Sequence, residues 1–169
     1  MNVIENCADV QRAMIEIGIP GRNDLRLVNA LIDFNGTLAF DGRLIDGAAD
    51  RLRSLSKLLE LHVVTGDTTG TAREALAGLP MQLHLMPRDD QDVAKRAVLA
   101  GFDAARTVAV GNGRNDRGLL EQAALSIIVI GREGCAAASL ARADIVCASI
   151  VDALDLLLTP RRIVATLRS

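Results

Sequence analysis

The chain of 169 residues contains no Trp, no Tyr and only three Phe residues. Ala, Leu, Val and Ile supply most of its apolar half, so we expect an aliphatic core, as in strands covered by helices on both faces. No apolar run reaches the ~18 residues that a membrane-spanning helix requires. The net charge of −2 gives no electrostatic reason to bind nucleic acid or an anionic membrane. These absences favour an α/β protein that binds neither.

Cysteine is also scarce, and the three residues are Cys7, Cys135 and Cys147. Their number is odd and their spacing matches no metal-binding pattern, which favours reduced thiols. The first residues lack the basic start and the apolar stretch of a signal peptide. The sequence therefore predicts a cytoplasmic protein.

Apolar residues recur along the chain with the period of a strand and the period of a helix in turn. Because single helices separate the strands, we expect a doubly wound, mostly parallel sheet with helices on both faces. An N-terminal β-hairpin is predicted from strands over 14–19 and 25–34, and residues 14–169 are predicted to form a single domain after a peripheral segment, 1–13. The remaining predictions are a small hairpin over 38–45, strands over 61–65, 81–86, 107–110, 125–130 and 144–147, and helices over 47–60, 69–77, 90–100, 114–123, 135–142, 150–158 and 160–167.

The stretch LIDFNGTLAF, residues 31–40, is the first candidate site. An apolar run ends in Asp33 and a turn around Gly36 follows, which places a carboxylate at the C-terminal edge of a buried strand, where open α/β sheets bind ligands. A carboxylate there can attack phosphorus and can ligate Mg²⁺, although it could also simply cap a turn. Gly36 would let the backbone approach a phosphoryl group, and Thr37 would offer a hydroxyl to it.

Two further polar residues follow later strands. Thr65 ends a predicted strand, where its hydroxyl can bond a phosphoryl oxygen or, like Asp67, cap the next helix. Lys95 is one of only two lysines and lies in the helix after the following strand. Its ammonium could offset phosphoryl charge and hold Asp33 ionised, or it could be a solvated helix residue.

The run VAVGNGRNDRGLL, residues 108–120, is the second strong signal. A strand leads into a Gly-rich turn and then into a helix. Asp116 near the start of that helix can be a metal ligand or a plain helix cap. Asn112, Gly113 and Asn115 make the preceding loop polar and tight.

Taken together, the runs LIDFNGTLA, VVTGD and GNGRND, with Lys95 between the last two, resemble the motifs of the haloacid dehalogenase-like superfamily. The resemblance is closest to the phosphorylation domain of P-type ATPases and its small soluble relatives, and it covers roughly residues 25–158. It implies a Rossmann-like fold and Mg²⁺-dependent phosphoryl transfer through an aspartyl-phosphate.

The resemblance also implies a role for each matching residue. Asp33 would be the nucleophile, Thr65 would bind the phosphoryl group and Lys95 would pair with both, and together with Asn35 they make the predicted catalytic set. The phosphate-binding residues would be Gly36, Thr37, Thr65, Gly66, Lys95 and Asn115, and the Mg²⁺ ligands would be Asp33, Asn35 through its backbone carbonyl, Asn112 and Asp116.

Two positions depart from the superfamily pattern. Asn35 stands where phosphatases of the superfamily carry the Asp that protonates the leaving group and then activates water. An amide can do neither, which removes acid–base catalysis worth ~10²–10⁴-fold. P-type ATPases also lack a carboxylate there. Asn112 likewise replaces an Asp of the second motif, and the loss of its charge is expected to weaken Mg²⁺ binding.

The spacing of the motifs leaves no room for an inserted cap domain, because residues 38–60 and 66–107 hold only a small hairpin and ordinary βα units. The site would then be open to solvent unless a neighbouring subunit covers it. Capless relatives often oligomerise or act on large substrates. We therefore expect a homo-oligomer that acts on a small phosphorylated substrate or a phosphoprotein.

Three functions are compatible with these residues. The favoured one is a slow phosphatase that acts best on phosphates with good leaving groups. The alternative is a catalytically weak phosphate-binding or regulatory subunit whose open edge meets a partner. The third is a receiver domain, which is disfavoured because receivers need an acidic pair at the end of the first strand, and the acidic residues before Asp33 form none.

Overall fold

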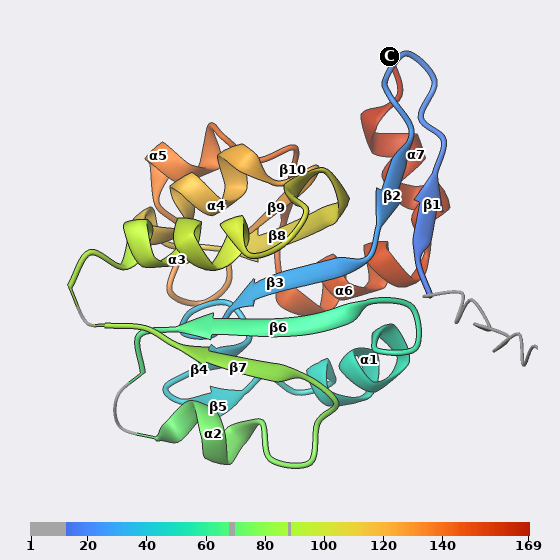
Figure 1. Cartoon of the computed structure of the whole chain (residues 1–169). Helices are drawn as coiled ribbons and strands as arrows, with labels where there is room; N and C mark the ends of the chain where they lie inside the picture. The colour runs from blue at the N-terminus through green and yellow to red at the C-terminus, as the bar shows by residue number, and fades with distance from the viewer. Residues whose placement is uncertain (1–12, 68–69, 88) are drawn as a thin grey trace, which may run out of the picture.

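The computed structural model describes residues 13–67, 70–87 and 89–169 (Figure 1). Its centre is a six-stranded sheet with the strand order β10-β9-β8-β3-β6-β7, and every neighbouring pair is parallel. The predicted doubly wound parallel sheet is therefore confirmed. Its strands are β3 (Asn29–Asp33), β6 (Glu60–Thr65), β7 (Gln82–Leu85), β8 (Thr107–Gly111), β9 (Leu125–Val129) and β10 (Ile145–Cys147).

The order of the strands reverses beside β3. From β3 the chain builds outward to β6 and β7, then returns to place β8 on the other side of β3 and continues to β9 and β10. The carboxyl ends of β3 and β8 therefore flank a topological switch point, where the two following loops diverge. In open α/β sheets this is the place where ligands bind.

Helices cover both faces of the sheet, as predicted (Figure 1). Side chains alternate between the faces along each strand, so Ala30 and Ile32 of β3 join one core cluster and Leu31 joins the other. On one face lie α1 (Ala48–Leu55), α2 (Thr71–Ala75) and α6 (Ile150–Leu158), and on the other lie α3 (Gln91–Ala100), α4 (Arg117–Gln122) and α5 (Ala137–Leu140).

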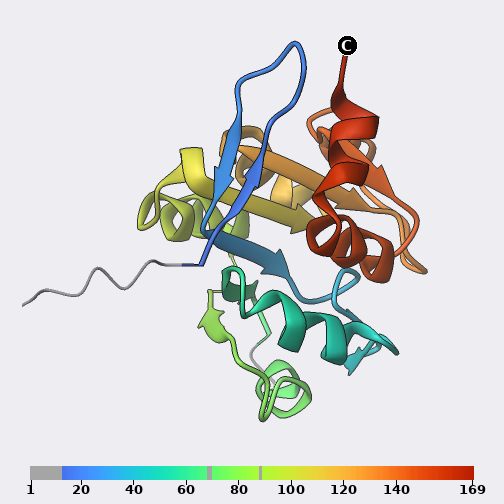
Figure 2. The ribbon, with the colours of Figure 1, turned by 90° about the vertical axis from the view of Figure 1, so that its right-hand side faces the viewer.

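The N-terminal hairpin forms a two-stranded sheet of its own at the amino end of β3 and shares a core cluster with it. Strands β1 (Ile15–Ile17) and β2 (Leu25–Leu27) pair antiparallel, and β1 packs against α7 (Pro160–Leu167). Figure 2 shows the hairpin and α7 rising together beside the sheet, and Figure 1 shows that they lie far from the carboxyl end of β3. This unit therefore lies away from the candidate site.

The prediction of one strand over 25–34 was wrong, because the structure divides it into β2 and β3. Val28 lies between them, and it bonds through its N–H to Arg106 and through its carbonyl to Glu60, each at 2.8 Å. The apolar alternation of β2 serves the hairpin, whereas β3 is buried on both faces. A continuous apolar pattern thus hid a change of sheet.

The hairpin predicted over 38–45 is confirmed by β4 (Ala39–Phe40) and β5 (Arg43–Leu44). Its turn residues Asp41 and Gly42 both have positive φ, of 50° and 74°, as a two-residue hairpin turn requires. The predicted helix 114–123 begins as a 3₁₀ turn, η2 (Arg114–Asp116), and another such turn, η1 (Ala104–Arg106), precedes β8. The predicted peripheral segment falls outside the described residues except for residue 13.

None of the helices within the described residues is long and apolar enough to span a bilayer.

Candidate active site

The carboxyl ends of three neighbouring strands bring distant parts of the sequence together. Asp33 ends β3, Thr65 ends β6 and Asn112 follows β8 directly. These residues are 5%, 1% and 8% exposed. Because the strands are parallel, all three lie at the same edge of the sheet, at the switch point between β3 and β8.

Lys95 of α3 links two carboxylates inside this site. Its Nζ lies 2.5 Å from Oδ1 of Asp33 and 2.5 Å from Oδ1 of Asp116. Lys95 and Asp116 are both fully buried. The neighbouring Arg96 instead pairs with Asp92 on the exposed side of α3. The alternative that Lys95 is a solvated helix residue is therefore excluded.

One ammonium faces two carboxylates in this buried cluster, so its charges do not balance. Burial, followed by the charge of Asp116, raises the pKa of Asp33 to about 7, although Lys95 opposes the shift. Burial alone would lower the pKa of Lys95, but the two carboxylates outweigh it and raise that pKa. Lys95 thus stays an ammonium at neutral pH, and any added cation would favour the ionised form of Asp33.

Both carboxylate oxygens of Asp116 are bonded within the chain. Oδ1 accepts from Lys95, and Oδ2 accepts from the backbone N–H groups of Asn112 and Gly113, at 3.0 and 2.8 Å. Asp116 therefore anchors the lysine and fixes the turn after β8. Its predicted ligation of Mg²⁺ stays a prediction.

The loop after β3, which carries Gly36 and Thr37, and the loop after β8 contact each other through buried side chains. The fully buried Thr37 donates its hydroxyl to Oδ1 of Asn112 at 3.2 Å, and its hydrogen bonding also lowers the pKa of Asp33. Gly36 has φ +76°, and a Cβ there would collide with the side-chain amide of Asn112. Only glycine therefore allows this close approach of the two loops.

The hydroxyl of Thr65 is oriented by two donors. Its Oγ1 accepts from the backbone N–H of Asp67 at 3.1 Å and from Nδ2 of Asn35 at 3.4 Å. The helix-capping task falls to Asp67, whose Oδ2 accepts from Ala72 at 2.6 Å. Thr65 donates to no acceptor within the described ranges, which leaves its hydrogen for a ligand. Asn35 is exposed beside it.

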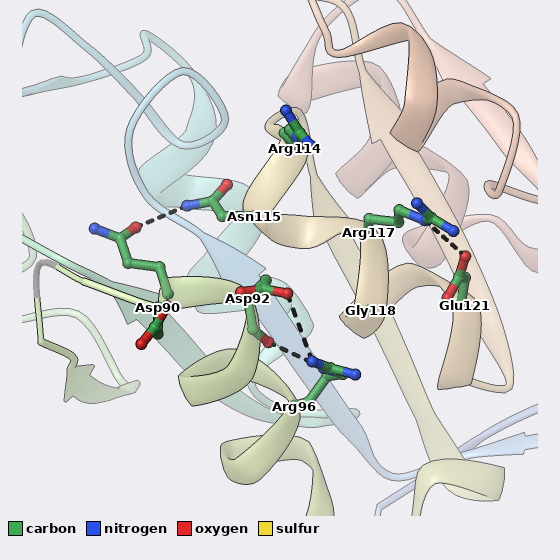
Figure 3. A pocket seen from close by; sticks show the side chains of 9 residues that line it. Asp90, Asp92, Arg96, Arg114, Asn115, Arg117, Gly118 and Glu121 are labelled. Carbon is green, nitrogen blue, oxygen red and sulfur yellow. Dashed lines mark hydrogen bonds and ion pairs between the residues drawn. The ribbon is translucent and has the colours of Figure 1, made fainter.

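Asn115, labelled in Figure 3, lies at the side of the site. Its Nδ2 donates to Oε1 of Gln91 at 2.7 Å. A Cβ at Gly66 would collide with the side chain of Gln91, so Gln91 passes over the loop after β6. Beside them a pocket of about 620 Å³ opens between α3 and α4. Its rim carries two ion pairs, Arg96 with Asp92 and Arg117 with Glu121 (Figure 3).

A second pocket of about 990 Å³ lies between the β4–β5 hairpin and the loops after β9 and β10. Gly36 lines it, so this pocket borders the loop after β3. On its rim the guanidinium of Arg132 lies over the ring of Phe40, 5.3 Å from the ring centre. The pocket therefore offers both an apolar and a cationic surface next to Gly36.

The chain is 49% identical to the uncharacterised protein MJ0073 of Methanocaldococcus jannaschii over 63 residues, which are 37% of this chain and 68% of MJ0073. The chain belongs to the family of MJ0073. A second uncharacterised protein of the same organism, MJ0072, is 38% identical over 39 residues, which are 23% of this chain and 89% of MJ0072. No family model matches the sequence. These relatives define a family without naming an activity.

Solved structures identify the fold of this member of the MJ0073 family. Cobalt-bound deoxy-D-mannose-octulosonate 8-phosphate phosphatase from Haemophilus influenzae is 15% identical, with a TM-score of 0.67 over 85% of this chain and 94% of that one. A putative haloacid dehalogenase superfamily hydrolase from Legionella pneumophila is 14% identical, with a TM-score of 0.67 over 83% and 87%. The chain therefore has the haloacid dehalogenase-like fold. The particular closeness to P-type ATPases stays a prediction.

One residue near the site was missed by the sequence analysis. Glu133 follows β9, and its Oε2 lies 2.8 Å from the position that a Cβ would take at Gly36. No motif marks it, but the run Gly131-Arg132-Glu133-Gly134 follows a predicted strand and so had to lie at the same edge of the sheet. That rule alone could have added Glu133 to the candidates.

The oxygen atoms of the site suit a hard cation, although acidic ligands are few. Within residues 13–67, 70–87 and 89–169, no three His, Cys, Asp or Glu side chains form a metal-binding group. Mg²⁺ accepts carboxylate, amide and carbonyl oxygens and keeps several waters. Asp33, the amide of Asn112 and the backbone carbonyl of Asn35 provide these ligand types, so the site fits Mg²⁺ with one carboxylate fewer than the superfamily pattern.

Proposed function

We propose that this protein is a Mg²⁺-dependent phosphatase that acts through an aspartyl-phosphate on Asp33 and turns over slowly. The observation that supports it is the buried cluster of Asp33, Lys95 and Asp116 at the switch point. The burial of these charged groups carries a large desolvation penalty, so stabilisation of the fold does not explain the cluster. Binding of a phosphoryl group would explain it.

The structural neighbours support the same chemistry. Besides the phosphatase from Haemophilus influenzae, 3-deoxy-D-manno-octulosonate 8-phosphate phosphatase from Moraxella catarrhalis was solved in complex with a magnesium ion, a phosphate ion and a KDO molecule. It is 16% identical to this chain, with a TM-score of 0.66 over 84% of this chain and 94% of that one. A bound phosphate on the same fold is what the Asp33 site is proposed to hold.

In the first step, a carboxylate oxygen of Asp33 attacks phosphorus, the bond to the leaving oxygen breaks, and the electron pair departs with the leaving group. Lys95 and the hydroxyl of Thr65 stabilise the charge on the phosphoryl oxygens. Water then attacks phosphorus, which frees Asp33 and releases inorganic phosphate. When bound, Mg²⁺ would offset further phosphoryl charge, with Asp33, Asn112 and the backbone carbonyl of Asn35 as its protein ligands. Asp116 positions Lys95 in this scheme.

The side chain at position 35 makes this enzyme slow. Asn35 can form a hydrogen bond, here to Thr65, but it can neither protonate a leaving oxygen nor deprotonate water. The carboxylate and phenolate leaving groups of acyl and aryl phosphates depart without a proton donor, so these phosphates are the favoured substrates. The 990 Å³ pocket beside Gly36 is large enough for a small leaving group, which supports it as the substrate site. In this proposal a neighbouring subunit of a homo-oligomer covers the open site.

Replacing the nucleophile tests this function. With Mg²⁺ and either p-nitrophenyl phosphate or acetyl phosphate, Asp33→Asn is expected to reduce turnover at least about 10³-fold, because an amide oxygen is a poor nucleophile. The matched control is Asp24→Asn, which removes a carboxylate from the exposed turn between β1 and β2 and is expected to leave turnover unchanged. Equal rates for Asp33→Asn and the unaltered chain would leave only the phosphate-binding or regulatory subunit.

Restoring the missing acid tests the role of position 35. Asn35→Asp is expected to raise turnover of alkyl phosphates by about 10²-fold and to change turnover of acetyl phosphate far less, because only the alkoxide needs a proton. Comparing kcat on the two substrate classes measures the effect. A lower kcat on alkyl phosphates would refute the proton-transfer role of this position.

A further inference from the structure

Glu133 brings a carboxylate to the loop after β3 from the loop after β9, which the motifs do not include. Its Oε2 and Nδ2 of the Asn112 side chain lie 2.8 and 2.3 Å from the place where a Cβ would stand at Gly36, while Oδ1 of Asn112 accepts from Thr37. Gly36 is three residues beyond Asp33. The absence of a side chain at Gly36 thus creates a small cradle in which a carboxylate and an amide meet.

The loop that carries Glu133 is held in place on both sides of this residue. Before it, Gly131 packs so closely on Gly36 that a Cβ there would stand 3.2 Å from the Gly36 carbonyl. After it, the carbonyl of Gly134 accepts from Nδ2 of Asn112 at 3.3 Å, and the N–H of Ala136 donates to the Asn112 carbonyl at 2.9 Å. The backbone around Glu133 is therefore docked on the site.

The carboxylate of Glu133 has no cation beside it within the described part of the chain. The neighbouring Arg132 lies over Phe40 instead. Glu121, by contrast, is paired with both Arg117 and Arg142, at 3.0 and 3.1 Å. Glu133 thus adds an uncompensated negative charge beside Asn112, at a site that already has one carboxylate more than it has ammonium groups.

We propose that Glu133 is a ligand of the divalent cation and supplies the carboxylate that Asn112 lacks. This inference rests on the proposed function, because it uses the same cation site. The placement favours a metal ligand over a replacement for the acid–base group, since Glu133 lies beside Asn112 whereas the side chain of Asn35 points toward Thr65 on β6. The carboxylates of Glu133 and Asp33 would then place beside the cation a negative charge that neutral ligands do not supply.

Binding of Mn²⁺ to the full chain tests this role without relying on activity. Electron paramagnetic resonance counts free Mn²⁺ directly, and isothermal titration with Mg²⁺ provides the second measurement. Glu133→Gln is expected to weaken Mn²⁺ affinity about tenfold. The matched control is Glu74→Gln, an exposed glutamate on α2, which is expected to change affinity less than about twofold. Circular dichroism and urea unfolding show that each variant folds.

A reciprocal variant sharpens the assignment. Asn112→Asp places the carboxylate at the usual position, so it is expected to tighten Mn²⁺ binding and to make the additional Glu133→Gln change nearly silent. If the two changes were simply additive, Glu133 and Asn112 would not share a ligand position. Equal effects of Glu133→Gln and Glu74→Gln on affinity would likewise overturn the inference.

Asp33→Asn separates failure of this inference from failure of the proposed function. If Asp33→Asn leaves Mn²⁺ affinity unchanged, the cation does not bind at the nucleophile and the proposed function fails with it. If Asp33→Asn abolishes binding while Glu133→Gln keeps it, only the role of Glu133 is refuted. Unchanged Mn²⁺ affinity with a loss of turnover for Glu133→Gln would show a proton-transfer role and would also overturn the ligand assignment.

Discussion

The two faces of the central sheet are covered by helices of different chemistry. On one face, α1 buries Ala48, Leu52 and Leu55. On the other, α3 buries Leu99 together with Lys95, whose ammonium reaches the two carboxylates of the candidate site. One face is thus an ordinary aliphatic core, and the other combines a core with a buried ionised cluster.

This difference separates apolar residues, whose burial stabilises the fold, from charged residues, whose burial carries a desolvation penalty. Apolar burial lowers the free energy of the folded state in proportion to the area buried. A buried charge lowers this free energy only when attraction to its partners exceeds its desolvation penalty. Removal of one partner leaves that penalty without compensation. Substitutions on the apolar face should therefore affect stability alone, whereas those on the polar face should affect stability and ligand binding together.

The largest effect is expected from Lys95→Met. Asp33 and Asp116 would then face each other without a cation, and the variant is expected to lose about 3–5 kcal/mol of unfolding free energy and all phosphatase activity. The matched control is the only other lysine, Lys57, which is exposed and follows α1, and Lys57→Met should change stability by less than about 0.5 kcal/mol. Urea unfolding measures both. Equal losses in the two variants would remove the contrast between the faces.

A change on the apolar face should be smaller and confined to stability. Leu52 of α1 is fully buried against the sheet, so Leu52→Ala is expected to lower the free energy of unfolding by about 3 kcal/mol. Leu58, which is 36% exposed, provides the control, and Leu58→Ala should cost less than about 1 kcal/mol. Affinity for Mn²⁺, measured below the unfolding transition, should stay unchanged in both. A tenfold loss of affinity in Leu52→Ala would show that the two faces are coupled.

The sequence predicted the positions of candidate site residues correctly where these residues end a regular strand or stand out by composition. Asp33 and Thr65 were found because each ends a buried strand, and Lys95 stood out because lysine is rare in this chain. Elements with a clear period were also placed within a few residues. The division of 25–34 was missed because β2 and β3 share one apolar pattern, although they belong to different sheets.

Contacts between loops were the part that the sequence did not reveal. The approach of Glu133 to Gly36 depends on how two loops from separate strands fold over the sheet edge, and no periodic pattern encodes that. The sequence did not reveal the hydrogen bonds to both carboxylate oxygens of Asp116 for the same reason, because the turn after β8 positions the backbone donors. Local pattern thus predicts which strand end carries a residue, whereas packing decides its partners.

A second polar pair on the same face is neutral rather than ionised. His62 of β6 is 1% exposed, and its Nδ1 lies 3.2 Å from Nε2 of His84 on β7. Phe102 packs on His62, with 4.4 Å between ring centres. Among the described residues, Nε2 of His62 has no hydrogen-bond partner. Burial lowers the pKa of both histidines, and for His62 the neighbouring His84 adds to the shift.

The smallest predicted effect is a loss of stability in acid that originates in this pair. One proton suffices for the bond between the rings, and a second would place an N–H of His62 where no acceptor lies. Because the folded pKa is below the ordinary value of 6.5, the unfolded chain binds protons first, so stability should fall as the pH drops through 6.5. The raised pKa of Asp33 acts in the opposite direction below about 7, so the difference between the unaltered chain and His62→Phe isolates the histidines. Urea unfolding at about pH 7.5 and about pH 5.5 should show a smaller acid loss in His62→Phe, and Leu52→Ala should keep the full loss. Parallel losses in all three proteins would place the acid sensitivity outside the histidine pair.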